Sequence, residues 1–133
     1  MSFGVPQIDV NSMLRTADNT ISANETENTG NALVIDLGPG SGYFGLWWWI
    51  SNPTTVTGST PGYTFTLRSS PDRVTWSDVL DPPAPTITNA GMYIYPLQTN
   101  QRYISYKSVR GNADNLAVAI SMGITDAVML GPR

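Results

Sequence analysis

The sequence contains no cysteine and no histidine. Without cysteine there are no disulfide bonds and no thiolate nucleophiles, and without histidine there is no imidazole for acid–base catalysis. The usual zinc sites rely on the same two residue types and are excluded as well. Most common enzyme mechanisms are therefore unavailable. A chain without thiols also behaves in the same way in reducing and in oxidising surroundings.

Charged side chains are scarce, because they make up only 13% of the 133 residues, about half of the usual share. The formal net charge is −3, and Lys107 is the only lysine. The basic residues are scattered and form no stripe that could neutralise phosphates, so we expect no nucleic-acid partner. So little charge suggests a surface committed to contacts, and the length fits a single domain.

Long apolar runs are also missing from the sequence. No stretch approaches the ~20 residues of a membrane span. The first residues, MSFGVPQIDV, lack the basic start and the apolar run of a signal peptide. We therefore expect a protein that is made in a cytoplasm and has no membrane partner.

No pattern of residues nominates a catalytic or metal site. The aspartates stand mostly in turn-like surroundings, where Asp bonds to its local backbone, and no two carboxylates form an evident acid–base pair. The serines have no histidine or evident lysine partner. GNADN (111–115) lacks the dense oxygen-ligand spacing of a calcium loop. We expect a non-enzymatic protein with no catalytic residue, no cofactor and no bound metal.

Short apolar runs bounded by Gly, Pro, Asn and Asp begin at Ala32 and predict strands rather than helices. The expected strands are ALVIDL (32–37), FGLWWWI (44–50), YTFTLRS (63–69), RVTWSDV (73–79), MYIYPL (92–97), RYISYKSV (102–109) and LAVAISMGI (116–124). Their spacing predicts an all-β fold, an antiparallel β-sandwich or jelly roll of about seven to eight strands. Within it we expect Trp48, Tyr103 and Tyr106 to be structural.

The composition divides the chain into three parts. Residues 1–31 are polar and irregular, residues 32–126 carry the strand pattern of the sandwich, and residues 127–133 form a C-terminal tail. We expect the first part to form an extended N-terminal arm and a first short strand. It can be a frayed terminus, an arm that docks on a partner, or both. Its sparse apolar residues are candidates for such an interface: Phe3, Val5, Ile8, Met13 and Leu14.

The strand FGLWWWI is apolar on both faces. Side chains alternate along a strand, so Trp48 shares one face with Leu46 and Ile50, while Trp47 and Trp49 share the other. Three explanations for the second face remain open. A loop or the N-terminal segment covers it, or Trp47 and Trp49 belong to a protein–protein interface, or exposed indoles form a platform for sugar rings.

The segment between the third and fourth expected strands predicts a turn. Asp72 in SSPDR can accept hydrogen bonds from the backbone N–H groups that follow it, and Pro71 fixes the entry to the turn. Trp76 is then expected to pack back over the sheet. Two proline-rich stretches, 51–62 and 81–91, predict long loops suited to contacts or to crossovers between sheets.

The order of these elements resembles a known family. NALVIDLG (31–38), an aromatic strand, YTFTLRSSPDRVTWSDV (63–79), RYISYKSVRG (102–111) and the final strand LAVAISMGI follow one another. This succession resembles the jelly-roll capsid cement proteins of tailed phages, the Bordetella-phage type. The triple tryptophan and the long polar N-terminal segment depart from that pattern.

The resemblance implies a non-enzymatic cement, or decoration, protein. Such a protein sits on the outside of the assembled phage head, bridges neighbouring major capsid subunits to stabilise the head, and associates with itself as a homodimer or homotrimer. The implied location is the outer capsid surface of the virion, after synthesis in the host cytoplasm. A carbohydrate-binding β-sandwich module and a tail or neck subunit of a phage are the alternatives.

Overall fold

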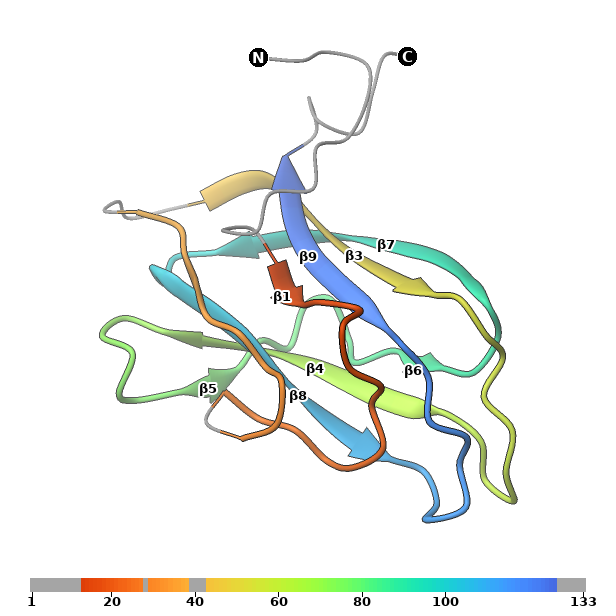
Figure 1. The fold of residues 1–133 in the computed structure, drawn as a ribbon. Helices are drawn as coiled ribbons and strands as arrows, with labels where there is room; N and C mark the ends of the chain where they lie inside the picture. Colours follow the sequence, from red (N-terminus) through yellow and green to blue (C-terminus); the bar gives the residue numbers. More distant parts are fainter. Residues whose placement is uncertain (1–12, 28, 39–42, 127–133) are drawn as a thin grey trace, which may run out of the picture.

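The computed structural model describes residues 13–27, 29–38 and 43–126, with only the backbone described for residues 43–45 and 126. These residues form nine β-strands and no helix (Figure 1). The strands are β1 (Met13–Arg15), β2 (Ile35–Asp36), β3 (Tyr43–Asn52), β4 (Tyr63–Ser70), β5 (Ser77–Asp78), β6 (Thr86–Ile87), β7 (Gly91–Thr99), β8 (Tyr103–Arg110) and β9 (Ser121–Asp126). The described residues thus include no helix that could span a membrane.

The strands form two sheets in which all pairs are antiparallel. One sheet has the order β1-β9-β3-β7, and the other has the order β2-β8-β4-β5 with β6 also pairing β4. The pairing is nested along the chain. The first strand pairs with the last, β2 with β8, β3 with β7, and β4 with β5 and β6.

This architecture confirms the predicted fold class, an all-β chain with two antiparallel sheets. Three expected strands are shorter in the structure, and RVTWSDV (73–79) forms only the two-residue β5. ALVIDL forms the two-residue β2, and LAVAISMGI enters a sheet only at Ser121. LAVAISMGI is shortened because its first half has no strand to pair with. Val118 forms only an isolated bridge, to Ile21, so the residues before β9 are not part of a ladder.

The core lies between the two sheets (Figure 1). β4 shows why the sequence folds this way, because its residues alternate between buried and half-buried until Ser69. Phe65 and Tyr106 contribute ring-to-ring contact at a centroid distance of 5.9 Å. Tyr106 is fully buried, as expected of a structural residue. The buried side chains with the greatest volume in this core include Trp48, Tyr63, Tyr106, Phe65, Leu14, Ile21, Ile50 and Leu67.

The described residues before Ala32 are part of the sandwich. From β1 the chain runs across the edge between the two sheets and returns to β2 (Figure 1). On this path it forms two isolated bridges to other parts of the sandwich, one from Ile21 to Val118 and one from Glu25 to Ser108. The first short strand expected in this region is β1, and the residues that follow it are docked onto both sheets. The expected apolar residues Phe3, Val5 and Ile8 lie outside the described residues.

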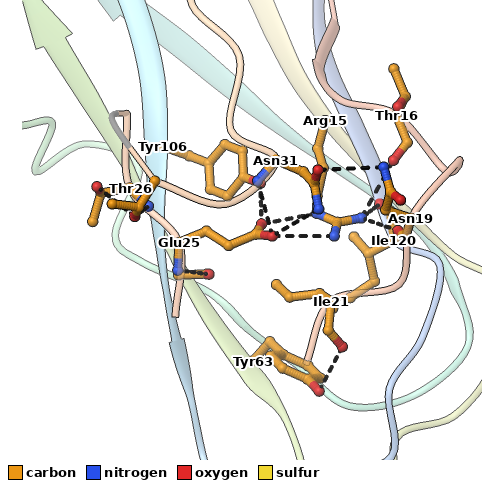
Figure 2. Close-up of polar contacts among 12 residues, drawn as sticks. Arg15, Thr16, Asn19, Ile21, Glu25, Thr26, Asn31, Tyr63, Tyr106 and Ile120 are labelled. Carbon is orange, nitrogen blue, oxygen red and sulfur yellow. Dashed lines mark hydrogen bonds and ion pairs between the residues drawn. The ribbon is translucent and has the colours of Figure 1, made fainter. Parts of the chain in front are cut away.

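A buried ion pair holds this segment in place (Figure 2). Arg15 is fully buried, and its Nε donates to Glu25 Oε1 at 3.0 Å. The guanidinium also donates to the carbonyl oxygens of Ile120 at 2.7 Å and Asn19 at 2.8 Å. From β8, the Tyr106 hydroxyl donates to Glu25 Oε1 at 2.5 Å. One carboxylate thus joins the N-terminal segment to strands of both sheets.

The surroundings of Glu25 decide its ionisation state. Burial alone raises the pKa of this carboxyl, but the hydrogen bonds from Arg15 and Tyr106 and the charge of Arg15 outweigh burial and hold the pKa below its usual value. Burial and the hydrogen bond to Glu25 raise the pKa of Tyr106. Glu25 is therefore an anion at neutral pH, and its pairing with the Arg15 guanidinium has a structural role.

Candidate functional site

The outward face of the four-stranded sheet carries no charged side chain among the described residues. Partners across strands share a face, and the register places Met13, Gly123, Trp49 and Ile94 in one row across all four strands. Alternation along each strand then gives the members of this surface, which we call the uncharged face: Met13, Trp47, Trp49, Ser51, Met92, Ile94, Pro96, Gln98, Ser121, Gly123 and Thr125.

The three tryptophans divide between the two faces of β3 as alternation predicts. Trp48 points into the core, is fully buried and contacts the ring of Tyr95 at a centroid distance of 5.6 Å. Trp47 and Trp49 belong to the uncharged face. Trp49 is only 9% exposed, whereas Trp47 is half-buried. Trp49 is therefore largely covered within a single chain, and Trp47 retains part of its surface for a partner.

Two further candidates for an interface are also covered within the chain. Met13 is 7% exposed and Leu14 is fully buried. A register shift between Met13 and Arg15 turns Leu14 into the core. Both side chains are thus covered within the single chain and offer little surface to a partner, and their role in an interface stays a prediction.

The accessible apolar surface of the uncharged face lies along β7. Met92 is 59% exposed and Ile94 is 44% exposed, and Pro96 is exposed as well. At one end of this row, Pro96 and Gln98 line a hollow together with Asp81. Sequence reasoning missed these residues. The sequence did contain a sign of this surface, because MYIYPL, like FGLWWWI, has apolar residues on both faces of its strand.

The outward face of the other sheet has the opposite character. Arg68 of β4 forms ion pairs with Asp78 of β5 at 2.6 Å and with Glu27 at 3.0 Å. Lys107 of β8 also contacts Asp78, at 3.1 Å. The hydrogen bonds and charge of Arg68 and Lys107 hold the pKa of Asp78 below its usual value. We call this surface, with Asp36 and Arg102 at its edge, the charged face.

Tyr103 lies on the charged face rather than in the core. It pairs with Asp36 of β2 across the strands, and its ring is 5.2 Å from the Arg102 guanidinium and 5.5 Å from that of Arg73. Arg102 Nε donates to Asp36 Oδ1 at 2.7 Å. The hydrogen bonds from Arg102 and from the Gly38 backbone lower the pKa of Asp36 to about 2. The structural role of Tyr103 is therefore at the surface.

The turn between β4 and β5 forms the hydrogen bonds described for Asp72. Its Oδ1 accepts from the backbone N–H groups of Val74 and Thr75, both at 2.9 Å. Trp76 is half-buried at this turn and donates through Nε1 to the carbonyl oxygen of Arg73 at 3.3 Å. Trp76 is thus a turn residue and not a member of the core, and it lies on a different sheet from Trp47 and Trp49.

The geometry defines what each face can do. Among the described residues no group of three or more carboxylates gathers as a metal site would require. The uncharged face has no ionisable group among its described residues, so it can bind a partner only by burying apolar area and by hydrogen bonds of neutral groups.

No known protein-family model matches the chain, and the search of curated proteins finds no match.

Proposed function

We propose that this chain is a capsid cement protein of a tailed phage. In this role it does no chemistry. It binds the outer surface of the assembled head, bridges neighbouring major capsid subunits, and associates with copies of itself. The observation that carries the proposal is the separation of charge between the two outward faces.

The separation of charge supports a partner on the uncharged face. Two solvated outward faces of one sandwich are expected to resemble each other, and here one carries a network of ion pairs while the other carries no charge. The centre of a protein–protein interface is depleted of charge and enriched in aromatic residues and methionine. The accessible residues of the uncharged face, which include Trp47, Met92 and Ile94, have this composition, whereas the charged face carries ion pairs that water can solvate. We infer that the uncharged face binds and that the charged face points outward.

The order of the strands supports the family. A jelly roll is a double-sheet antiparallel fold that occurs in viral capsid domains, among others. The nested pairing, with β1 beside β9 and β4 beside β5, is compatible with a ribbon of paired strands rolled into two sheets. We therefore propose that the sandwich is a jelly roll, which agrees with the resemblance of the sequence elements to phage cement proteins.

The physical effect of cementing follows from linkage. A protein that binds only the assembled shell adds its binding free energy to the resistance of the shell against heat and internal pressure. Each contact can be modest, because symmetry repeats it and because a self-associated protein attaches at several sites at once. A flat apolar face suits such contacts better than a deep pocket does.

The alternative sugar-binding function needs exposed indoles in one row. Trp49 is 9% exposed, and Trp76 lies on the turn of the other sheet. These positions favour the binding of a protein surface over the stacking of sugar rings.

The test compares one added charge on each outward face. Ser121 of β9 is half-buried on the uncharged face, and Thr66 of β4 is half-buried on the charged face. Ser121→Glu should weaken co-sedimentation with heads assembled without the chain by about tenfold or more, since it buries a carboxylate in the contact. The matched control Thr66→Glu should bind like the wild type. Equal binding of both variants would contradict the assignment of the face.

A further inference from the structure

Strand β7 is an edge strand that differs from every other sheet edge in the described residues. The other edges are formed by β1, β2, β5 and β6, which have three, two, two and two residues, whereas β7 has nine. β7 pairs with β3 on one side and with no described strand on the other. Very short edge strands prevent edge-to-edge association, while a long apolar edge promotes it. Three edge regions of this fold are therefore protected, and one is not.

The composition and the exposure of β7 also leave its edge unprotected. Its sequence, GMYIYPLQT, contains no charged residue. Met92 and Ile94 are 59% and 44% exposed, and Tyr93 and Tyr95 are half-buried. Charged residues at an edge are the common way to discourage pairing, and this edge has none. The backbone groups on its free side and the apolar side chains beside them thus form one continuous surface.

We propose that β7 pairs with the β7 strand of a second copy of this chain. The two strands lie antiparallel across a two-fold axis, so that the four-stranded sheets of two copies join into one continuous sheet. This inference deepens the self-association in the proposed function and rests on that part of it. It names the surface and the symmetry, and it does not require a phage head.

Three features identify a second copy as the occupant. A free strand edge is satisfied by another strand, and β7 is the long strand of the described chain whose edge is free. A two-fold axis brings the same segment of two copies together in antiparallel direction, which is the pairing that this sheet already uses. Finally, a strand that meets its own copy places like residues near each other, and an uncharged strand does so without repulsion.

Pro96 limits the region that can pair. Proline has no N–H to donate, so within a sheet it belongs on an edge strand with its nitrogen away from the ladder. Backbone groups two residues apart on a strand point in the same direction, and those of Met92 and Ile94 therefore point like those of Pro96. The pairing region is then the first half of the strand, Gly91–Tyr95.

The test uses a pair of opposite charges at one position. Ile94→Lys and Ile94→Glu each place two like charges, one from each copy, close to the proposed two-fold axis. We expect each variant alone to raise the dimer dissociation constant by about tenfold or more in sedimentation equilibrium. An equimolar mixture of the two should restore dimers, because the lysine of one copy then lies diagonally across the axis from the glutamate of the other. Val109→Lys is the matched control, because Val109 is 51% exposed on the charged face, and it should not change the oligomer.

A second variant keeps the test independent of charge. The N–H of Ile94 points to the free edge, as the nitrogen of Pro96 does, so Ile94→Pro removes an N–H from that edge only. We therefore expect loss of the dimer and, at low protein concentration, the same melting temperature as the wild type. The proposal is overturned if the wild-type chain is a monomer, if these variants leave its oligomer unchanged, or if the mixture fails to restore dimers. Head binding by a monomeric chain would support the cement function and refute the pairing of β7 between two copies. A β7-dependent dimer that ignores heads would do the reverse.

Discussion

The buried pair of Arg15 and Glu25 permits a quantitative prediction. Both side chains are covered, with 0% and 5% of their surface exposed, and they are joined at 3.0 Å. Glu25→Ala leaves a buried guanidinium with only its carbonyl partners and also deprives the Tyr106 hydroxyl of its acceptor. Breaking a buried pair in this way costs about 3–5 kcal/mol. We expect a loss of that size in the free energy of unfolding.

The double variant separates the pair from its surroundings. Arg15→Met with Glu25→Leu removes both charges and fills the space with apolar groups, and such replacements are often close to neutral. The summed losses of the single variants Arg15→Met and Glu25→Leu should therefore exceed the loss in the double variant by at least about 2 kcal/mol, measured by urea denaturation of the wild type and these three variants. Additive losses would contradict this role of the ion pair, because they would mean that Arg15 and Glu25 do not hold the N-terminal segment together.

Three further predictions concern the core, the edge of the charged face and the turn between β4 and β5. Trp48→Ala should lower the free energy of unfolding by about 3–5 kcal/mol, because the indole is fully buried, and Trp47→Ala should cost clearly less in the same melts. Asp36 has a pKa lowered to about 2 by Arg102, so its stabilising contribution is present above its unfolded pKa of about 3.9 and is lost as the pH falls through the folded value. The melting temperature of Asp36→Asn should thus fall less steeply than that of the wild type between about pH 4 and pH 2, unless the ion pair does not form in solution. Asp72→Ala should lower the melting temperature and speed proteolysis of the turn, because the backbone N–H groups of Val74 and Thr75 lose their acceptor. Unchanged proteolysis at that turn would contradict its role.

The sequence predicted the fold class because strand alternation is a local property. YTFTLRS alternates with period two, and the corresponding β4 is buried with the same period. The number and length of the strands depend on partners that the pattern does not contain. The alternation of Leu116 to Ile120 indicates burial correctly at Val118 and Ile120, yet the chain has only an isolated bridge there.

The candidate site was predicted in part. The double apolar character of FGLWWWI indicated that the second face of this strand is unusual and left three explanations for it open, and in the structure that face is part of the uncharged face. The sequence did not reveal that Met13 and Trp49 fall into one row with Gly123, because register between distant strands decides this. Nor did it show that β7 ends the sheet. The order of strands in a sheet depends on tertiary packing, and the composition of a single strand does not specify it.

Co-sedimentation of the purified chain with assembled heads, compared with free major capsid subunits, is the most direct measurement of the cement function. We predict saturable binding to the expanded heads in fixed proportion to their subunits, little binding to free subunits, and a higher temperature of DNA release from the occupied heads. A chain that stays in the supernatant with heads, or that binds free subunits equally well, would contradict the proposal that the uncharged face recognises an assembled shell.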